Sequence, residues 1–393
     1  MKLSAIVFSA VVTLIVAAPP AWSDRAPSPG SAPLLTVTVR PDALIIPVTI
    51  HGRVYHFLLD TGMATLVIDN PLAHELTRKA SPEQISPLYQ QILSAGLRTA
   101  GGALDQKDLQ VWQPLAIAIG DVVLPATTPW LGADLSALTQ ATGVTIDGIV
   151  GRDIFRQFTW QVDNQTHQLT VWPQVPGALD YPYCEPYLDG NDAGPRLTLD
   201  YHHRPVTMQV NTGVDYSYIS AEMINVSREQ PESAVLTSVD QPVLGIGGEE
   251  VSDGYSLSGL SFNQIPLGKL LARESKHGAF GLGMNFLARF DRYLFIPGEM
   301  QFCYSEQHFT RDEPAPLRLL AVRYYAKHVE LFSNPPAALL PFGLQNGDAL
   351  LEVNGSQVQP EEIHRIRSAL ADTPAGQLTL KIERRGKIKT LHI

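Results

Sequence analysis

The feature that most constrains how this chain can fold is an internal repeat. Residues 151–172 read GRDIFRQFTWQVDNQTHQLTVW, and residues 283–304 read GMNFLARFDRYLFIPGEMQFCY. The two segments align without a gap, so that Gly151, Asp153, Phe158 and Trp172 correspond to Gly283, Asn285, Phe290 and Tyr304. Each segment predicts a short helix followed by two strands around a turn. The same structural unit is therefore expected twice in the chain.

Two further pairs of segments occur in the same order. Residues 54–68 (VYHFLLDTGMATLVI) match residues 205–219 (PVTMQVNTGVDYSYI), and in both a Thr-Gly turn separates two β-rich runs. The third pair is AGG at residues 100–102 and IGG at residues 246–248, each followed by alternating apolar residues. Matching in three ordered pairs is the signature of duplication rather than of a shared turn type.

The repeat predicts a body of two lobes. Lobe 1 spans residues 34–175 and lobe 2 spans residues 195–308, and the segment 176–194 between them is rich in Pro, Gly and Asp, which is typical of a linker. The β-rich runs and the many turn residues predict a mainly β fold.

The C-terminal part of the chain differs from both lobes. Residues 343–355 read GLQNGDALLEVNG, a helix pattern follows at Pro360–Leu370, and two short strands follow around Arg385-Gly386. This motif resembles the PDZ family, and the resemblance covers residues 314–393. It implies a small α+β domain that accepts a peptide as an added strand beside a helix.

The resemblance to PDZ domains implies a peptide groove with Val329–Phe332 as its edge strand and the helix at 363–370 opposite. The residues expected to line it are Val329, Leu331, Phe332 and Ile363. The segment from Ala315 to Phe342 contains no glycine, so the glycine loop that captures a peptide C-terminus is not expected. A docking domain without a peptide ligand is the alternative.

The turn at residues 60–62, Asp-Thr-Gly, carries the chemistry. Alone it is typical of an ordinary turn in which Asp caps the backbone and Gly accepts a positive φ. Here the apolar runs FLL and LVI flank it, and IVGRD follows at residues 149–153. Together these motifs resemble the retropepsin-type aspartic proteases over most of residues 34–308.

This resemblance implies two retropepsin- or pepsin-like closed β-barrel lobes with a cleft between them, in which each lobe supplies one Asp. Two carboxylates about 3 Å apart cannot both ionise cheaply, so they share one proton. The ionised one takes a proton from water and the neutral one donates to the peptide carbonyl. Glycine-tipped hairpins close over the substrate. The implied flap tips are Gly101, Gly102, Gly247 and Gly248.

In this chain Asp60 is the expected catalytic carboxylate, and Asn211 stands where the second Asp belongs. The residues implied to support the two turns are Thr61, Gly62, Thr212 and Gly213. An Asn side chain can donate and accept hydrogen bonds, but it cannot exchange the shared proton. Losing one acid–base group costs about 10²–10⁴ in rate.

Three interpretations follow. The protein is an aspartic-type endopeptidase that works with Asp60 and Asn211, or a silent pseudo-protease that binds peptides as a scaffold, or a dimer that pairs two Asp60 turns. The duplication argues against the dimer, because lobe 2 already occupies the place of a partner. Asp215 corresponds to a residue that faces substrate in retroviral proteases, so it is expected to contact substrate rather than to catalyse.

Composition excludes several other classes. The net charge is −10, and from Pro314 onwards 10 basic side chains outnumber 7 acidic ones, so the acidic excess lies in the first 313 residues. An acidic body repels nucleic acid, so the expected partner is a polypeptide. No phosphate-binding loop or metal-ligand cluster occurs, so we expect neither a cofactor nor a metal. Cys184 and Cys303 can form one disulfide, with two buried thiols as the alternative.

The N-terminus predicts export. Lys2 precedes an apolar run that ends near Ala18, and small residues follow up to Ser23, which is typical of a cleavable secretory signal at residues 1–23. A periplasmic or secreted protein without stable membrane insertion is expected. An uncleaved membrane anchor is the lesser possibility, because the run is short and Pro19-Pro20 follows it.

Overall fold

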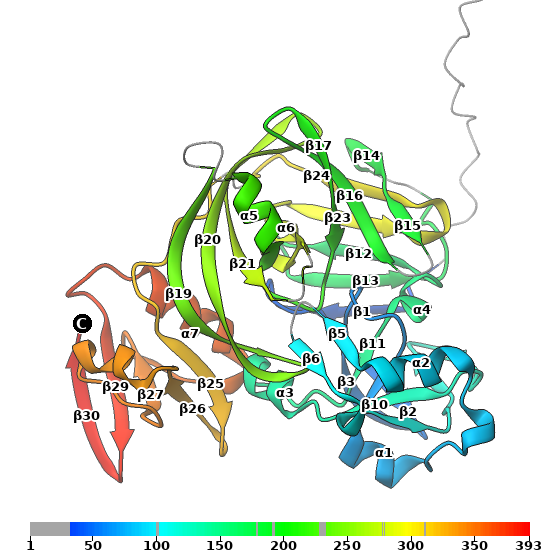
Figure 1. The fold of residues 1–393 in the computed structure, drawn as a ribbon, viewed down its shortest axis with the longest axis horizontal. Helices are drawn as coiled ribbons and strands as arrows, with labels where there is room; N and C mark the ends of the chain where they lie inside the picture. The colour runs from blue at the N-terminus through cyan, green and yellow to red at the C-terminus, as the bar shows by residue number, and fades with distance from the viewer. Residues whose placement is uncertain are drawn as a thin grey trace, which may run out of the picture.

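The computed structural model describes residues 32–99, 102–177, 180–190, 193–227, 233–276, 278, 280–309 and 312–393. The predicted signal peptide and the predicted flap residue Gly101 lie outside these ranges. The described part is mainly β, as expected, and four large sheets organise it (Figure 1). Among the described residues no helix is both long and apolar enough to cross a membrane.

The first sheet contains the Asp-Thr-Gly turn. Its strands, in spatial order, are β7 (Gln110–Trp112), β10 (Trp130–Ala133), β4 (Val67–Asp69), β11 (Gly148–Val150), β3 (Arg53–Leu59), β2 (Ile45–Ile50), β8 (Ile117–Ile119) and β9 (Val122–Leu124). In β2 partly buried and fully buried residues alternate strictly, as expected for a strand with one face on a core. This sheet is curled but open in the described residues, so the predicted closed barrel is wrong here. Its edge strands β7 and β9 have three residues each and do not pair with each other in the described residues.

The second sheet contains the Asn-Thr-Gly turn. Its strands, in spatial order, are β15 (Leu188–Gly190), β16 (Ala193–Tyr201), β17 (Arg204–Val210), β22 (Gly281–Leu282), β18 (Ser217–Ser220), β21 (Ile265–Ser275), β20 (Gly248–Phe262) and β19 (Ala234–Gly245). Strand β16 also pairs with β20, through Asp200↔Ser261 and Tyr201↔Leu260. This extra pairing curls the second sheet round onto itself, and strands of 9 to 15 residues make it possible.

The two sheets share their central pairings. In the first, β3 pairs parallel with β11, β11 antiparallel with β4, and β4 parallel with β10. In the second, β17, β22, β18 and β21 repeat these three pairings in the same order and sense. In the first sheet the Asp-Thr-Gly turn therefore follows β3, which pairs with β11. In the second sheet the Asn-Thr-Gly turn follows β17, which pairs in the same way with β22.

A third sheet connects these two. Its strands, in spatial order, are β1 (Leu35–Thr38), β13 (Gln168–Trp172), β12 (Thr159–Asp163), β23 (Arg292–Ile296), β24 (Gln301–Ser305) and β14 (Tyr183–Pro186). The repeated segments supply β12–β13 and β23–β24, preceded by the short helices α4 (Arg152–Phe155) and α6 (Met284–Leu287), as predicted. Part of the predicted linker forms β14 and β15.

One hydrophobic core runs through the first, second and connecting sheets. Aromatic side chains fill its centre, and Phe155, Phe290, Phe295 and Phe302 are each at most 1% exposed. Replacing one such side chain by Ala costs about 3–5 kcal/mol of folding free energy. A single core of this kind fixes the relative position of the two turns.

Cys184 on β14 and Cys303 on β24 form a disulfide and are direct cross-strand partners. The bond therefore fastens an edge strand to the connecting sheet. It does not clasp the first sheet to the second, because both cysteines belong to the same sheet.

Residues 321–393 form a separate sheet with its own core. Its strands, in spatial order, are β25 (Ala321–Tyr325), β26 (His328–Phe332), β27 (Ala349–Val353), β29 (Thr379–Arg384) and β30 (Lys387–His392), with β28 (Ser356–Gln357) beside β27. Helix α7 (Ile363–Asp372) covers one face, with Ile363, Ile366 and Leu370 in the core. We call this part the C-terminal domain. It packs beside the first and second sheets (Figure 1).

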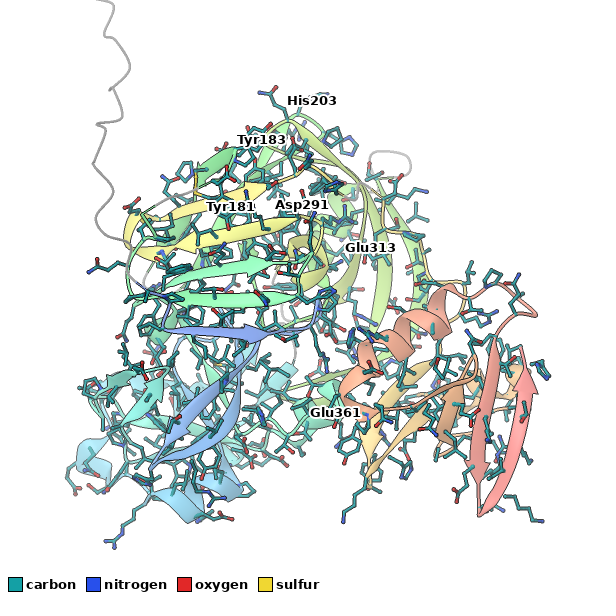
Figure 2. The ribbon with its side chains drawn as sticks, turned by 180° about the vertical axis from the view of Figure 1, so that it is seen from behind. Tyr181, Tyr183, His203, Asp291, Glu313 and Glu361 are labelled. Carbon is teal, nitrogen blue, oxygen red and sulfur yellow. A yellow bond between two sulfur atoms is a disulfide. The ribbon has the colours of Figure 1, made fainter. Side chains whose placement is uncertain are left out.

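The remaining described helices lie on the first and second sheets. They are α1 (Asn70–Leu76), α2 (Pro87–Ala95), α3 (Ser136–Thr142) and α5 (Ala221–Ser227). Helix α3 meets the C-terminal domain, where Gly143, just beyond its end, lies too close to the backbone of Pro360 for any Cβ. Arg40 donates to the carbonyl of Glu361 at 3.3 Å, and Glu361 marks this contact in Figure 2.

Candidate active site

The two Thr-Gly turns meet through a reciprocal hydrogen-bond lattice. The hydroxyl of Thr61 donates to the carbonyl of Val210 at 2.7 Å, and that of Thr212 donates to the carbonyl of Leu59 at 2.7 Å. Each hydroxyl also accepts from the backbone N–H of the other threonine, at 3.1 and 3.2 Å. Both threonines are at most 1% exposed. The lattice therefore locks two turns about 150 residues apart into one rigid unit.

The two turn glycines bring the opposing side chains together. A Cβ on Gly62 would collide with the amide of Asn211, and a Cβ on Gly213 would collide with the carboxyl of Asp60. Each glycine is thus needed for close approach rather than for an unusual φ. The structure brings all six turn residues singled out in the sequence into one site.

Asp60 is held as an acceptor at the base of this site. Its Oδ1 accepts from the backbone N–H of Gly62 at 2.7 Å. Burial raises the pKa of Asp60 to about 6, although hydrogen bonds from Gly62 and Met63 and the positive charge of Arg152 oppose the rise. A carboxyl with this pKa is ionised at neutral pH and is easily protonated in mild acid, which suits a general base.

Asn211 is oriented by its neighbours. Its Oδ1 accepts from the backbone N–H of Gly213 at 2.8 Å, which leaves the NH₂ group as the donor side of the amide. The Asn211 side chain hydrogen-bonds Tyr218, whose hydroxyl donates to Oε1 of Gln209 at 3.4 Å. The Asn211 amide is therefore held from both sides by hydrogen bonds within the protein, to Gly213 and to Tyr218.

Tyr218 and Gln209 are site residues that the sequence did not reveal. Burial strongly raises the pKa of Tyr218, and its hydrogen bond with Asn211 opposes this rise. The hydroxyl lies where a side chain on Gly281 would have to go. All four residues of β18 are buried, so the sequence carries no local signal that sets Tyr218 apart as a neighbour of Asn211.

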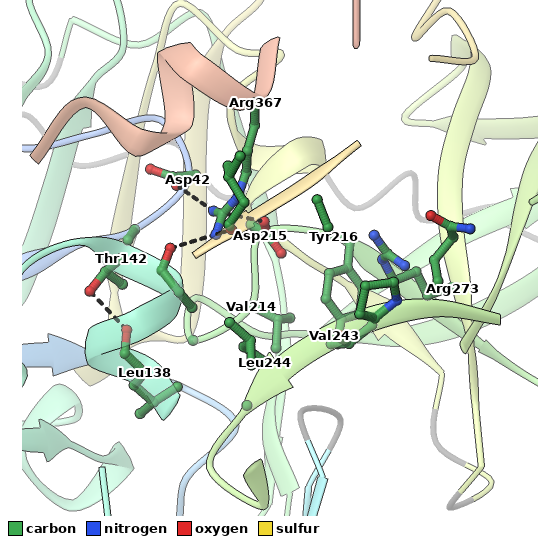
Figure 3. Close-up of a pocket in the computed structure, with 18 of the residues that line it drawn as sticks. Asp42, Leu138, Thr142, Val214, Asp215, Tyr216, Val243, Leu244, Arg273 and Arg367 are labelled. Carbon is green, nitrogen blue, oxygen red and sulfur yellow. Dashed lines mark hydrogen bonds and ion pairs between the residues drawn. The ribbon is translucent and has the colours of Figure 1, made fainter. Parts of the chain in front are cut away.

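A cavity of about 260 Å³ opens above the turns, between the two sheets and the C-terminal domain (Figure 3). Asp60, Asn211 and Gly213 line its base. The hairpin β19–β20 lines one side through residues 241–246, and residues 318–322, which lead into the C-terminal domain, line another. The candidate catalytic groups therefore face a space large enough for a side chain and adjoining backbone.

The predicted flaps are hairpins. Strands β5 (Leu97–Thr99) and β6 (Gly102–Leu104) pair antiparallel up to Thr99↔Gly102, and β19 and β20 pair antiparallel up to Gly245↔Gly248. Gly248 has a φ of +99°, a conformation that favours glycine, and a Cβ there would meet nothing. Ile246 at the second tip is 6% exposed and packs with the cleft-side residues of the first sheet.

Asp215 lines the cavity, as expected for a residue that contacts substrate, but its charged partner was not foreseen. Arg367 of α7 lies 3.9 Å from the carboxylate of Asp215 and 3.8 Å from that of Asp42. It also donates to the carbonyl of Ala141 at 2.6 Å. Burial lowers the pKa of Arg367, and the two carboxylates oppose this. One side chain thus joins the C-terminal domain to both sheets (Figure 3).

The predicted peptide groove of the C-terminal domain needs a correction. Strand β26 is not the edge of its sheet, because β25 pairs along its outer side from Ala321↔Phe332 to Tyr325↔His328. Val329, Leu331 and Ile363 are at most 1% exposed in the domain core. Only Phe332 reaches the cavity. Strand β25 was missed because its hairpin turn, Ala326-Lys327, has two positive φ values without a glycine.

Comparison with known families finds a match in the segment that forms most of the first sheet. Residues 46–154 match the family model described as aspartyl protease. The matched segment runs from β2 into α4 and contains the Asp-Thr-Gly turn, so this part of the chain is similar to the aspartyl protease family, which supports a protease-like function. No curated protein matches the chain. In the described residues no group of three His, Cys, Asp or Glu side chains could hold a metal ion.

Proposed function

We propose that this protein is an aspartic-type endopeptidase that hydrolyses polypeptides in the cavity between the first and second sheets. The observation that carries the proposal is the reciprocal threonine lattice, which holds the Asp60 carboxyl against the Asn211 turn. A rigid pair of opposed polar groups beside a cavity is the arrangement that hydrolysis by activated water requires.

The chemistry needs only one titrating group. Ionised Asp60 takes a proton from a water molecule while the water oxygen bonds to the peptide carbonyl carbon. The NH₂ group of Asn211 donates a hydrogen bond to the carbonyl oxygen as it gains negative charge. The C–N bond then breaks, and Asp60 returns the proton to the departing amine nitrogen. Because Asn211 cannot supply a proton, we expect a rate about 10²–10⁴ below that of a two-Asp site.

The second candidate is a silent peptide-binding protein. Asn211 itself favours it, because its side chain is 4% exposed and already engaged by Gly213 and Tyr218. Such a site would keep the shape of a protease cleft and lose the proton exchange. The two candidates share the polypeptide ligand and differ only in turnover.

We extend the proposal to the whole chain. The shared pairings of the two sheets favour duplicated lobes, and the strand–helix arrangement of residues 314–393 favours a PDZ-like domain beside the cleft. The disulfide and the apolar N-terminus favour export to the periplasm or the medium, with membrane anchoring as the lesser possibility.

The test is cleavage of a mixed peptide pool by the full chain between pH 4 and pH 8, read by mass spectrometry. The variants are Asp60→Asn and Asn211→Asp, and Asp121→Asn on an exposed turn is the matched control. Cleavage that is lost in Asp60→Asn and kept in Asp121→Asn supports the peptidase. Cleavage only by Asn211→Asp supports the silent peptide-binding protein, and no cleavage by any variant overturns the peptidase.

A further inference from the structure

The shared pairings place residues of the two sheets in equivalent positions on the cleft side of each sheet. The four central positions of the first sheet carry Leu58, Val67, Leu131 and Ile149, related by the pairings Leu58↔Ile149, Val67↔Ile149 and Val67↔Leu131. The same positions of the second sheet carry Gln209, Tyr218, Arg273 and Gly281, related by Gln209↔Gly281, Tyr218↔Gly281 and Tyr218↔Arg273. An apolar set in one sheet is therefore matched by a polar and cationic set in the other.

The two sets have different surroundings. All four apolar residues of the first sheet are at most 3% exposed and belong to one hydrophobic cluster. Leu58 and Ile149 also line the cavity. In the second sheet, Gly281 leaves space that the Tyr218 hydroxyl occupies, and Arg273 points to the cavity. Of these eight residues, Leu58 and Ile149 from the first sheet and Arg273 from the second line the cavity, and we call these its apolar wall and its basic wall.

Arg273 is the positively charged side chain of this basic wall, and no ion pair with a carboxylate balances it in the described residues. Its guanidinium lies over the ring of Tyr216, 5.2 Å from the ring centre, and both side chains line the cavity (Figure 3). Its Nη1 is buried and has no hydrogen-bond partner in the described part of the chain. A buried donor without a partner is destabilising, and more so when it is charged. A ligand that accepts this hydrogen bond would remove that destabilisation.

The other charges of the cavity do not fill this role. Arg367 is balanced by Asp42 and Asp215. Arg318 donates to the backbone carbonyl of Thr373 and, at 3.5 Å, to that of Ile393. Within the described ranges no carboxylate forms an ion pair with Arg273, although Asp215 and Glu250 both act on the neighbouring Tyr216. The Arg273 guanidinium is thus the cavity group best suited to an incoming anion.

We propose that Arg273 determines substrate specificity by binding a carboxylate of the peptide on the second-sheet side of the scissile bond. The carboxylate comes from an Asp or Glu side chain or from the peptide C-terminus, since a guanidinium binds both through paired N–H donors. The opposite wall, with Leu58 and Ile149, takes an apolar side chain. This inference rests on the proposed function, because it assigns a specificity to the same cavity.

The test measures binding separately from cleavage. A pool of synthetic decapeptides is applied to the immobilised Asp60→Asn chain, which keeps the cavity and removes the base. Dissociation constants are then measured for retained sequences in matched Glu and Gln versions, each with a free and an amidated C-terminus. We expect a carboxylate at one position to bind about tenfold to a hundredfold tighter than its amide.

Variants identify the residue responsible. Arg273→Leu places in the second sheet the residue that Leu131 provides in the first, and it should abolish the preference. Arg273→Glu should reverse it towards Lys and Arg. Arg204→Leu, at an exposed arginine on β17, is the matched control and should change nothing. If Arg273→Leu does not fold, as judged by circular dichroism, the ratio of the Glu and Gln dissociation constants of the parent chain still decides whether the cavity prefers a carboxylate.

Each outcome has one meaning. A preference that survives amidation assigns the carboxylate to a side chain, and one that needs the free terminus assigns it to the C-terminus. A Glu-to-Gln ratio near one at every position, or a preference unchanged in Arg273→Leu, overturns the inference. Acidic peptides that bind but are never cleaved, even by Asn211→Asp, overturn the peptidase and leave Arg273 as an anion-binding residue. Cleavage of peptides without any acidic preference supports the peptidase and overturns the role of Arg273.

Discussion

At the residue scale, Asp60 links the chemistry of the site to the stability of the fold. Burial raises its pKa from the ordinary 3.8 to about 6. Between these values the folded protein holds a proton that the unfolded chain releases. The stabilising contribution of Asp60 to the free energy of unfolding is therefore fully present below pH 4 and is lost as the pH rises through 6.

The direction of this pKa shift predicts how the stability of the protein depends on pH. Raising the pH from 4 to 7.5 should lower the free energy of unfolding of the natural chain, relative to Asp60→Asn, by about 2–3 kcal/mol. Urea titrations of both proteins at each pH measure the difference. Because other carboxyls titrate alike in both, parallel pH profiles would show that the fold does not raise the pKa of Asp60.

Thr61 gives a second prediction at this scale. Thr61→Val removes the hydroxyl that serves the carbonyl of Val210 and the N–H of Thr212, both buried. Two buried groups without partners should cost about 2–4 kcal/mol of folding free energy. Thr61→Ser keeps the hydroxyl and is the control. Equal urea midpoints for the Val and Ser variants would mean that the lattice does not stabilise the turns.

At the element scale, the hairpin β25–β26 is strained at its turn. Ala326 and Lys327 have φ values of +47° and +69°, which a type I′ turn requires and which Asn-Gly accepts most readily. The double change Ala326→Asn with Lys327→Gly should raise the free energy of unfolding of the C-terminal domain by about 1–2 kcal/mol. Gly355→Ala, at φ +81°, should lower it. Thermal unfolding followed by domain-specific hydrogen exchange tests both directions.

The disulfide acts on the connecting sheet. Cys184 and Cys303 are 119 residues apart in sequence, so their bond restricts a long loop of the unfolded chain. Replacing both by Ala should lower the free energy of unfolding by about 4–5 kcal/mol in the chain-entropy account. Guanidinium titrations of oxidised natural protein and the double variant measure this. A loss below about 1 kcal/mol would mean that β14 is held by its strand pairing alone.

At the scale of the whole molecule, Arg367 joins the C-terminal domain to the two sheets. Arg367→Met keeps the length of the side chain and removes its bonds to Ala141 and its pairing with Asp42 and Asp215. Hydrogen exchange in α3 and β25 should become about tenfold faster, because a hydrogen bond from a charged donor is lost at the contact. Arg365→Met, on the exposed face of the same helix, should leave exchange unchanged. Identical exchange in both variants would show that the domain docks without Arg367.

The sequence predicted the local parts of this molecule. The β-rich runs, the repeated helix–strand–strand segments and the two Thr-Gly turns follow from short-range propensity and turn chemistry, and the structure contains them. The approach of the two turns also followed, because the resemblance between the segments implied two equivalent sheets. The chemistry proposed for Asp60 and Asn211 remains a prediction.

Tertiary structure alone decided the rest. Whether a sheet closes depends on pairings such as β16 with β20, which join residues about 60 apart and leave no local signal. The placement of Arg273 and Arg367 depends on which side of a strand or helix faces a cavity built from three parts of the chain. The free energy of burial is set by such non-local contacts, and only the folded chain brings them together.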